Sequence, residues 1–526
     1  MKKKGHQKVV FKPYDMNQLS LPMSLESMIP PQHKVRAVNQ VIDEIGIDPL
    51  LAKYKGGGAG SYHPKMMLKV LVYGYGRKVW SSRQLARALR ENIHFMWLAG
   101  GNTPDFRTIN RFRSDMKTII DEVFQLLVEY MAAEGLINLE EYYLDGTKIE
   151  ANANRYSFVW KKSVDKNQKK LREKVKGLLE EIDRANELED ELYGDQDLPE
   201  MGENVVNNPE AVADLVGRIN EALSKKGKND KSVKITRKAA RTLVKDCLPR
   251  AMKYKVQLAA IGNERNSMSK TDPEATFMRM KEDHMKNGQL KPAYNVQTGT
   301  QNQFVVGFSI HQKATDTSCL KVHLEGIKKA WGSVPQKIIA DAGYGSEENY
   351  EYLKEQEIQN FVKYNKFHYE QKRHVKTNPC LRENMVYDAE NDQYICYEHK
   401  KLKYIKTVKR KSTTGYESHV RVYECEDCTG CTNRESCTKS KYWNRRIEVN
   451  VRLEELKQEA RENLTSELGL ALRKRRCIEP EYVFGRIKWC WGFKRFLLRG
   501  LEKVKIEWGL LCMAHNISKM ATIQWA

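Results

Sequence analysis

Long apolar runs are absent from this chain of 526 residues. A membrane-spanning helix needs roughly 20 consecutive apolar residues, and no stretch approaches that length, which excludes an integral membrane protein. The N-terminal residues MKKKGHQKVVFKPYD are basic, but no apolar core follows them. They therefore lack the pattern of a secretory signal, and we do not expect export.

Acidic residues are in the minority, with 68 Asp and Glu against 90 Lys and Arg, a formal net charge of +22. Such an excess favours a polyanionic partner, either nucleic acid or an anionic membrane surface. The chain is 40% hydrophobic and 30% charged, so it can bury a core and is not disordered overall. At about 150 residues per domain, its length predicts about three or four folded units.

Cysteines are few and odd in number, eleven in all, which does not suit a disulfide framework. Four of them follow the spacing Cys425-x2-Cys428-x2-Cys431-x5-Cys437, and Cys396 lies upstream. Thiolates at x2 spacing reach a single tetrahedral Zn²⁺ ion, which stabilises a module with little core. We expect zinc at Cys396, Cys428, Cys431 and Cys437, with Cys425 in a strand. The alternatives are a set made of Cys425 through Cys437 alone, an iron–sulfur cluster, or thiols without a metal.

The first quarter of the chain has apolar residues at helical spacing. Helices are predicted over 82–92 and 106–116, with a polar turn over 102–105 between them. The second helix is basic and carries Arg107 and Arg111. This arrangement suits a helix-turn-helix that binds DNA, and the alternative is an ordinary helical bundle with a solvated basic face.

Strand patterns begin after residue 140. Strands are predicted over 141–149, 291–300, 304–312, 336–341 and 359–365, with a helix over 318–332. The Lys/Glu-rich segment 160–265 has helical spacing and a polar break over 193–210, which predicts an inserted helical hairpin. With the hairpin set aside, the order strand–strand–strand–helix–strand matches a ribonuclease-H-like mixed α/β fold.

Two aspartates occupy positions where that fold would bring carboxylates together. Asp145 lies on the first strand and Asp341 at the carboxyl end of the fourth, and these strands are neighbours in the expected sheet. The third acid should come from a late helix that begins near Pro480, where Glu481 and Lys488 are seven residues apart and hence on one face. Three such carboxylates would hold two Mg²⁺ ions about 3.5–4 Å apart for phosphodiester cleavage.

Other acids compete for these roles. Glu479 competes with Glu481, and Asp272 competes with Asp145, although Asp-Pro reads as a turn rather than a strand. Asp316 and His311 could also lie near the site. For any one of these acids, a role as a turn former or a solvated side chain is the simpler interpretation. Their joint placement on the first strand, the fourth strand and a late helix is what indicates a catalytic site.

Several ordered blocks of the sequence resemble bacterial insertion-sequence transposases of the Asp-Asp-Glu (DDE) superfamily. They are YLDGTKIEANANRYSFVWKKS (143–163), SKTDPEATFMRMK (269–281), LKPAYNVQTGT (290–300), IIADAGYGS (338–346) and the segment from EYVFGRIKW to GFKRFLLRGLEKV (481–504). The likeness extends over nearly the whole chain, and it is to the subgroup with a helical insertion after the first Asp and a cysteine-bearing insertion before the Glu.

The resemblance implies that Asp145, Asp341 and Glu481 are the catalytic, metal-binding acids and that Lys488 contacts DNA phosphate. The family's Tyr-Arg-Glu-Lys signature has an Arg four residues before the Glu, where this sequence has Cys477. We expect Arg475 or Arg476 to contact DNA in its place.

The resemblance further implies a DNA transposase that binds the terminal inverted repeats of its element. It would cleave phosphodiesters with two Mg²⁺ or Mn²⁺ ions and join the 3′-hydroxyl ends to target DNA. We expect a homodimer or larger assembly on DNA, in the cytoplasm at the bacterial nucleoid. The alternatives are a catalytically inactive, zinc-containing DNA-binding relative and an RNA-directed nuclease of the same fold.

The predicted domain organisation follows from these assignments. It comprises an N-terminal helical, helix-turn-helix-like DNA-binding domain (1–139), a ribonuclease-H-like core (140–160, 266–365 and 471–526), a helical insertion (161–265) and a cysteine-rich, zinc-ribbon-like insertion (366–470). The segment 471–526 holds twelve Lys and Arg with interleaved Trp and Phe. We expect most of these aromatic residues to be core, with one Trp free to act on DNA.

Overall fold

The computed structural model describes residues 24–46, 48–52, 61–193, 213–214, 217, 221, 231–280, 290–412, 414–440 and 442–524. The basic N-terminal segment and residues 194–210 of the expected polar break lie outside these ranges. The chain divides into two compact units, one of Met1–Asp115 with Ile517–Ala526 and the other of Met116–Asn516. Within the described part of the chain, no helix is long and apolar enough to cross a membrane.

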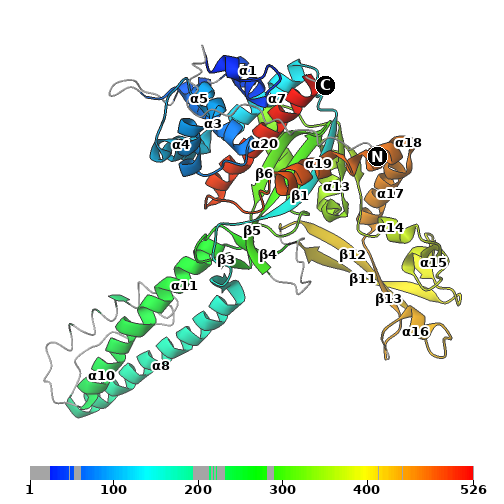
Figure 1. Ribbon diagram of the computed structural model, residues 1–526. Coiled ribbons are helices and arrows are strands. Elements are labelled where there is room, and N and C mark those ends of the chain that lie inside the picture. The colour runs from blue at the N-terminus through cyan, green and yellow to red at the C-terminus, as the bar shows by residue number, and fades with distance from the viewer. Residues whose placement is uncertain are drawn as a thin grey trace, which may run out of the picture. The chain divides into compact units, whose positions relative to one another are not determined.

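The N-terminal unit is helical (Figure 1). Its helices are α1 (Lys34–Glu44), α2 (Asp48–Leu51), α3 (Pro64–Gly76), α4 (Ser82–Glu91), α5 (Ile93–Leu98) and α6 (Phe106–Asp115). Helix α3 is buried along nearly its whole length and forms the core of the unit. Helix α4 begins after Ser81, whose side chain accepts a hydrogen bond from the Gln84 backbone N–H, and it buries Leu85 and Leu89. The predicted helices are confirmed, but α5 lies between them where the sequence indicated only a polar connection.

The second unit is built on a mixed sheet. Its strands are β1 (Glu141–Glu150), β4 (Thr276–Arg279), β5 (Leu290–Gln301), β6 (Phe304–His311), β7 (Lys337–Ala340) and β8 (Gln359–Val362). The order is β4-β5-β1-β7-β8, and β6 also pairs with β5. Strands β1, β5 and β6 form an antiparallel meander, whereas β7 and β8 run parallel to β1. The expected adjacency of the first and fourth strands is therefore confirmed.

Two glycines allow this sheet to accommodate a large side chain of β1. A Cβ atom at Gly299 would lie 1.9 Å from Cζ of Tyr142, and one at Gly307 would lie 2.5 Å from its hydroxyl. The Tyr142 hydroxyl is 2.6 Å from Nε2 of His323 on the crossover helix α12 (Leu320–Trp331). Helix α12 is thereby held against one face of β1. Helix α13 (Glu347–Glu355) follows β7 and leads to β8.

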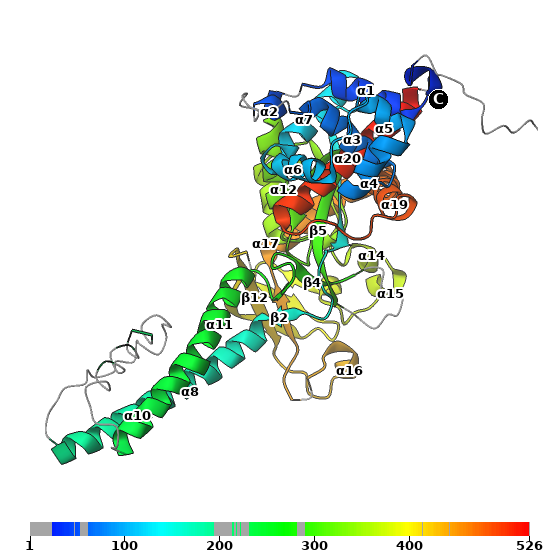
Figure 2. The same cartoon turned by 60° about the vertical axis from the view of Figure 1, so that its left-hand side comes forward.

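A helical hairpin is inserted between β1 and β4, as the apolar spacing predicts (Figure 2). It consists of α8 (Lys161–Tyr193), α10 (Lys231–Thr242), a π-helical turn (Leu243–Cys247) and α11 (Leu248–Ile261). The short strands β2 (Phe158–Trp160) and β3 (Ser267–Ser269) pair at its base. Its own small core includes Leu171, Leu179 and Ile182 from α8, packed with residues of α10 and α11.

A second insertion follows β8 and contains the cysteines. Its sheet has the order β13-β12-β11-β10-β9. The strands are β9 (Val386–Asp388), β10 (Gln393–Ile395), β11 (Lys401–Lys411), β12 (Glu417–Cys425) and β13 (Arg446–Val449). Its short helices are α14 (Phe367–Glu370), α15 (Arg373–Lys376) and α16 (Arg434–Cys437). We call the segment from Val386 to Val449 the cysteine module.

The remaining helices belong to the second unit, apart from the last residues of α20, which belong to the unit of the N-terminal helices. They are α7 (Ile120–Ala133), α17 (Val451–Thr465), α18 (Glu467–Arg476), α19 (Glu479–Gly485) with a π-helical turn (Arg486–Cys490), and α20 (Leu501–Gln524). Helix α17 packs against β8 and α13 of the central sheet. Helices α18 and α19 contact β7 and β1, so they bring the late basic segment to the sheet.

Candidate active site

Asp145 and Asp341 come together in the structure. Strands β1 and β7 pair in parallel up to Leu144 and Ala340, so the two aspartates follow neighbouring positions on adjacent strands. Nη2 of Arg476 lies 3.5 Å from Oδ1 of Asp145 and 3.6 Å from Oδ2 of Asp341. The Asp145 and Arg476 side chains are 13% exposed and that of Asp341 is 39% exposed. The two carboxylates therefore share one cation at a partly open edge of the sheet.

Asp316 lies beside this pair. Its Oδ1 accepts hydrogen bonds of 2.8 Å from the side-chain amides of Asn295 and Gln297 on β5. A Cβ atom at Gly343 would lie 3.0 Å from Oδ1 of Asp341 and 3.6 Å from Oδ2 of Asp316. Both carboxylates thus face the same glycine, and the interpretation of Asp316 as a residue near the site agrees with the geometry.

Tyr344 lies close to the carboxylates of Asp145, Asp316 and Asp341. Its side chain is fully buried and its hydroxyl donates a hydrogen bond to Gln297. Burial raises the pKa of Tyr344 well above its usual value, and the carboxylates of Asp316, Asp145 and Asp341 raise it further. The phenol is therefore neutral and acts as a fixed donor behind the aspartates.

The odd-numbered residues of β1 face the late helices. Nη1 of Arg475 lies 3.3 Å from Oε2 of Glu141, at the start of the strand. At its other end, Nζ of Lys488 donates a 3.2 Å hydrogen bond to the hydroxyl of Thr147, two residues beyond Asp145. Because side chains two apart on a strand share a face, the predicted cations Arg475 and Lys488 flank Asp145 on the face that it occupies.

Glu479 and Glu481 have different environments. Glu479 is 2% exposed, and its carboxylate accepts a 2.6 Å hydrogen bond from the Gln303 backbone N–H and pairs with Arg475 at 3.2 Å. Glu481 is exposed and makes no hydrogen bond or ion pair among the described residues. Glu479 therefore fixes α19 to the sheet, while Glu481 is the carboxylate of this helix that is available to a ligand.

Glu481 and Lys488 differ in burial, although their seven-residue spacing predicts that they share one face of a helix. Lys488 is 8% exposed whereas Glu481 is exposed. Lys488 lies within a π-helical turn over Arg486–Cys490, and its Nζ donates a hydrogen bond to Thr147 of β1. A seven-residue spacing places side chains on one face only in a regular α-helix.

The donor set suits a divalent cation of the magnesium type. Asp145 and Asp341 offer oxygen ligands on neighbouring strands, and the charge between them is already balanced by a guanidinium. Within the described ranges, however, no group of three or more His, Cys, Asp and Glu side chains is arranged to hold a metal ion. The structure thus brings two of the three predicted acids together and leaves Glu481 separate from them.

Lys363 adds a positive charge that the sequence did not single out. It follows β8, next to β7 in the sheet. Burial lowers its pKa, the cations Arg476 and Arg473 lower it further, and Asp341 acts in the opposite direction. The signal that would have indicated it is its position, because it follows a parallel strand just as Asp341 does.

In the N-terminal unit, Arg107 and Arg111 lie one turn apart on α6 and are both exposed. Arg113 is buried instead, and its guanidinium donates to the Tyr75 hydroxyl and to the Trp80 carbonyl oxygen. The basic residues of α6 are therefore divided between a structural arginine and two arginines free to meet a ligand from solvent.

In the cysteine module, Cys425 and Cys428 are buried with Leu402, Tyr423, Ile447 and Val449. Burial raises the pKa of the Cys425 thiol to about 12, and nearby Cys428 and Cys396 contribute to that rise. Sγ of Cys428 accepts a 3.3 Å hydrogen bond from the Arg445 backbone N–H.

Cys437 lies near three other thiols. The pKa of Cys437 is raised by burial, and the neighbouring thiols of Cys380, Cys428 and Cys431 contribute to its environment. Cys380 was missed in the sequence because it stands 45 residues before Cys425, outside any recognisable spacing. The four predicted zinc ligands and Cys425 lie in one neighbourhood, and among the described residues they do not form a group arranged to hold a metal ion.

The late aromatic residues are mostly core, as expected. Trp491, Phe493 and Phe496 are buried, whereas Trp489 is 59% exposed and Nζ of Lys494 lies 3.7 Å from its ring centroid. Asp272 is also buried, between β3 and β4, and accepts a 2.9 Å hydrogen bond from Tyr294. Its turn position agrees with the lower rank given to it.

Comparisons with known proteins bear on the family of the chain, and the ranges they match do not include Asp145 or Asp341. Residues 395–521 match the family described as "Transposase DDE domain", and residues 23–115 match "Transposase domain (DUF772)". DDE domains are found in enzymes that cleave nucleic acid. The predicted resemblance is therefore confirmed: the chain carries a transposase DDE domain and is related to insertion-sequence transposases.

Two curated relatives are described as "Probable transposase for insertion sequence element ISH11". They come from Halobacterium salinarum strains ATCC 29341 / DSM 671 / R1 and ATCC 700922 / JCM 11081 / NRC-1. Each is 27% identical over 104 residues, which is 19% of this chain and 31% of the relative. The alignment thus spans about a third of the relatives' length. No solved structure matches the chain.

Proposed function

We propose that this chain is a DNA transposase that binds the terminal inverted repeats of an insertion sequence, cleaves the element ends and joins their 3′-hydroxyls to target DNA. The observation that carries the proposal is the meeting of Asp145 and Asp341 around the Arg476 guanidinium. Two carboxylates on adjacent strands at a sheet edge, with several cations beside them, suit a metal-dependent site for a phosphodiester.

The sheet supports a ribonuclease-H-like core. Its order β6-β5-β1-β7-β8 combines an antiparallel meander with two parallel strands reached through crossover helices. In this arrangement Asp145 stands in the middle of the sheet and Asp341 on the next strand. We propose that a nucleic acid backbone passes over the end of the β1–β7 pairing, where both aspartates lie.

Asp145 and Asp341 are the proposed ligands of two Mg²⁺ or Mn²⁺ ions, with Glu481 as the third acid. Such ions activate the attacking oxygen and stabilise the leaving one. Arg476 is the cation that balances the aspartates, and with metal present its guanidinium is free to pair with a DNA phosphate. Lys488 and Lys363 would add positive charge that favours binding of a DNA phosphate at this site.

The N-terminal unit is the proposed reader of the terminal repeats. Arg107 and Arg111, exposed one turn apart on α6, would contact the DNA groove or backbone. Because two element ends must be paired before cleavage, we propose a homodimer or larger assembly on DNA.

We propose that the cysteine module binds one Zn²⁺ ion. Its ligands are Cys396, Cys428, Cys431 and Cys437. The support is chemical: five thiols share one neighbourhood, and Cys428 already accepts a backbone N–H, as a thiolate ligand does. Metal analysis of the purified chain tests this, with about one Zn²⁺ per chain expected. Iron or no metal would contradict it.

The decisive experiment uses labelled duplexes that carry the element's ends. Asp145→Asn and Asp341→Asn, which keep size and remove charge, should each abolish Mg²⁺-dependent nicking and joining and leave end binding unchanged. Unimpaired nicking by both variants would end the assignment of these acids. Wild-type protein that binds the ends but never nicks them would instead indicate a catalytically inactive DNA-binding relative.

A further inference from the structure

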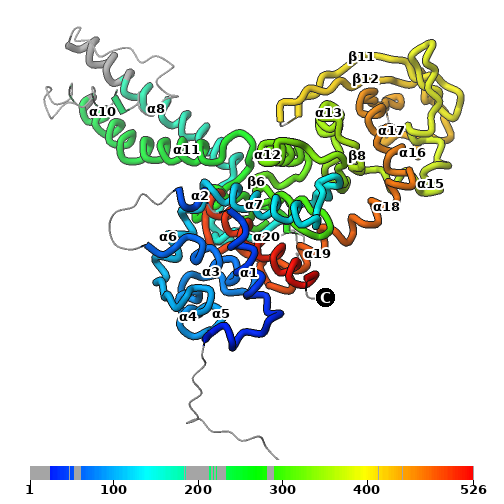
Figure 3. The backbone as a smooth tube through the Cα atoms, turned by 90° about the horizontal axis from the view of Figure 1, so that it is seen from above, coloured from blue at the N-terminus to red at the C-terminus, as the bar shows by residue number. Residues whose placement is uncertain are grey.

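Strands β11 and β12 form a two-stranded ribbon that extends beyond the rest of the cysteine module (Figures 1 and 3). Strand β10 pairs with β11 only at Lys401–Lys403, and β13 pairs with β12 only at Arg421–Glu424. Past these points, among the described strands, β11 and β12 pair only with each other. The outer part of β11 is therefore an open sheet edge.

The ribbon is strongly basic. Between residues 401 and 425 there are seven Lys and Arg and two Glu. Lys401, Lys406 and Lys409 are exposed and form no ion pair with the residues that the structure describes. Lys409 stands opposite His419, which is also exposed, so the two side chains share one face of the ribbon. The unneutralised charge of β11 is thus presented to solvent.

The other face of the ribbon is held against the central sheet's helices. Val420 on this face is buried, and Arg410 on the same face pairs with Glu448. Lys406 stands opposite Val422 and also lies on this face, whereas Lys409 lies on the other, so the two exposed lysines project to either side of the open edge of β11. At the tip, the Thr414 hydroxyl donates a hydrogen bond to Glu348 of α13. Helix α13 begins at Glu347, six residues after Asp341. The tip of the ribbon therefore contacts a helix that begins a few residues after Asp341.

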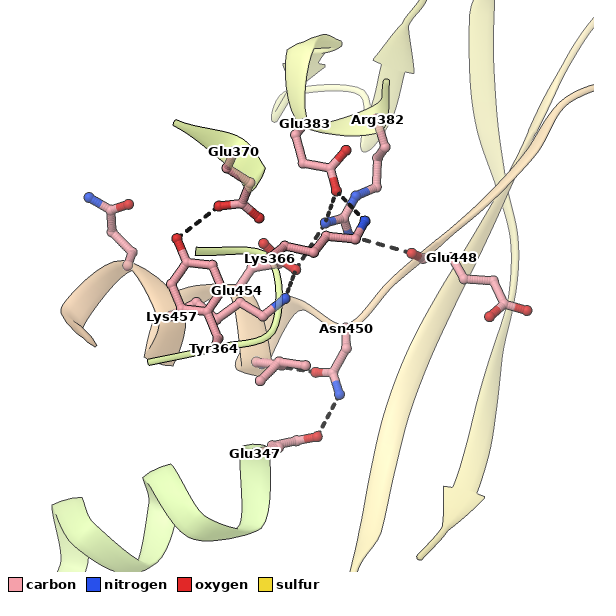
Figure 4. A network of polar contacts seen from close by, with 12 residues as sticks. Glu347, Tyr364, Lys366, Glu370, Arg382, Glu383, Glu448, Asn450, Glu454 and Lys457 are labelled. Carbon is pink, nitrogen blue, oxygen red and sulfur yellow. Dashed lines mark hydrogen bonds and ion pairs between the residues drawn. The ribbon is translucent and has the colours of Figure 1, made fainter. Parts of the chain in front are cut away.

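A polar network lies where β13, the strand that pairs with β12, leads into α17 (Figure 4). Nη2 of Arg382 lies 2.9 Å from Oε1 of Glu454 on α17, and Asn450 donates a 2.5 Å hydrogen bond to Glu347. These contacts line a groove of about 770 Å³ that also includes Thr317 and Ser346, next to the aspartate loop. The ribbon is thus linked to α13 through Thr414 and to β13 through Arg410.

We propose that this ribbon binds the phosphate backbone of duplex DNA without sequence preference, through Lys406 and Lys409 together with the exposed Lys401. Charge complementarity identifies the partner, because lysines without counter-ions on a fixed arm beside a DNA-cleaving site match a polyanion. At about 3.3 Å per residue, the 11 residues of β11 extend roughly 36 Å. That is close to one turn of B-DNA, about 34 Å.

This inference rests on the proposed function and goes beyond it by adding a DNA contact outside both the N-terminal unit and the aspartate site. Lysines on an open edge also keep sheets from pairing with each other, which is the competing role for the same residues. The two roles differ in what they require: edge protection needs any charge, whereas phosphate binding needs a positive one.

The test measures binding of the full chain to a fluorescent 30-base-pair duplex of arbitrary sequence, in EDTA, over a range of NaCl concentrations. Lys406→Gln with Lys409→Gln should weaken binding about ten-fold and reduce the slope of log affinity against log salt by about 2, near 0.9 for each lost phosphate contact. The matched control is Lys328→Gln with Lys329→Gln, two exposed lysines of α12, which removes the same charge and should change neither quantity.

A second variant separates the competing roles. Lys406→Glu with Lys409→Glu keeps the edge charged, so it should remain soluble and lose more affinity than the glutamine variant. An unchanged salt slope in both ribbon variants would overturn the proposal and leave edge protection as the role of these lysines. Failure of the wild-type chain to bind any duplex would instead overturn the proposed function itself.

Discussion

At the scale of single residues, Arg476 is the cation that faces both aspartates of the candidate site. Its guanidinium lies within 3.6 Å of both Asp145 and Asp341, where a divalent cation would also balance their charge. If metal and guanidinium neutralise the same carboxylates, removing one should strengthen dependence on the other. The aspartate pair is then a site whose stability is linked to the cation that occupies it.

We therefore expect Arg476→Gln to destabilise the metal-free chain by about 2 kcal/mol, because it leaves two partly buried carboxylates facing each other. Addition of Mg²⁺ should raise the Tm of this variant more than that of the wild type. Thermal unfolding with and without Mg²⁺ measures both effects. The control is Arg475→Gln, whose partners Glu141 and Glu479 are outside the pair. Equal Mg²⁺ shifts in wild type and Arg476→Gln would contradict this account.

The two glutamates of α19 should separate stability from catalysis. Glu481→Gln is expected to reduce cleavage at least 100-fold and to change the free energy of unfolding by less than about 0.5 kcal/mol, because the side chain is exposed. Glu479→Gln should lose about 1–3 kcal/mol of stability, since it weakens a buried charge-assisted network, and retain cleavage per folded molecule. Cleavage and urea unfolding are measured on both variants. The opposite pattern would transfer the catalytic role to Glu479.

Site residues differed in how far the sequence could identify them. Asp145 and Asp341 were found because each belongs to an apolar strand whose place in the sheet could be predicted. Asp316 was noted without a role, since its significance depends on Asn295 and Gln297, which reach it from a different strand. Lys363 was missed because only the parallel pairing of β7 and β8 places it beside Asp341.

At the scale of elements, local patterns carried the most information. Alternation and helical spacing predicted the strands of the central sheet, the crossover helix and the hairpin, and their order predicted which strands are adjacent. The strand order of the cysteine module was not predictable, because its strands bury few residues and its register depends on long-range pairing such as Leu402 with Cys425. The π-helical turn after α19 was also invisible, since its residues suit an α-helix equally well.

The close packing of Tyr142 into β5 gives a prediction about one element. Gly299→Ala should destabilise the chain by about 1–3 kcal/mol, because the new methyl group would overlap the Tyr142 ring and force the strand or the ring to move. The control is Gly177→Ala in α8, where nothing lies within 4 Å and a helical alanine should stabilise by about 0.5–1 kcal/mol. Urea unfolding reports both. A neutral Gly299→Ala would show that β5 adapts more easily than this packing indicates.

At the scale of the whole molecule, acid sensitivity follows from a buried chain of hydrogen bonds. His323 contacts the hydroxyls of Tyr142 and Ser309, and Ser309 lies 2.7 Å from Nε2 of His311. Burial lowers the pKa of His323 to about 3 and that of His311 to about 4. An unfolded histidine has a pKa near 6.5. Between these values the unfolded chain binds more protons than the folded one.

The stability contributed by neutral histidines is therefore complete above about pH 6.5 and is lost as the pH falls toward 4. Each histidine should reduce the free energy of unfolding by up to about 1.4 kcal/mol per pH unit in that window. Urea unfolding between pH 7.5 and pH 5 measures the slope for the wild type and for His323→Gln. The variant is expected to be less stable at neutral pH and to show a shallower decline on acidification. Carboxylates elsewhere in the chain titrate in both proteins, so the difference between the two slopes isolates His323. Identical slopes would mean that this imidazole is protonated in the folded chain as readily as in the unfolded one, and that the Tyr142–His323–Ser309 chain tolerates a buried charge.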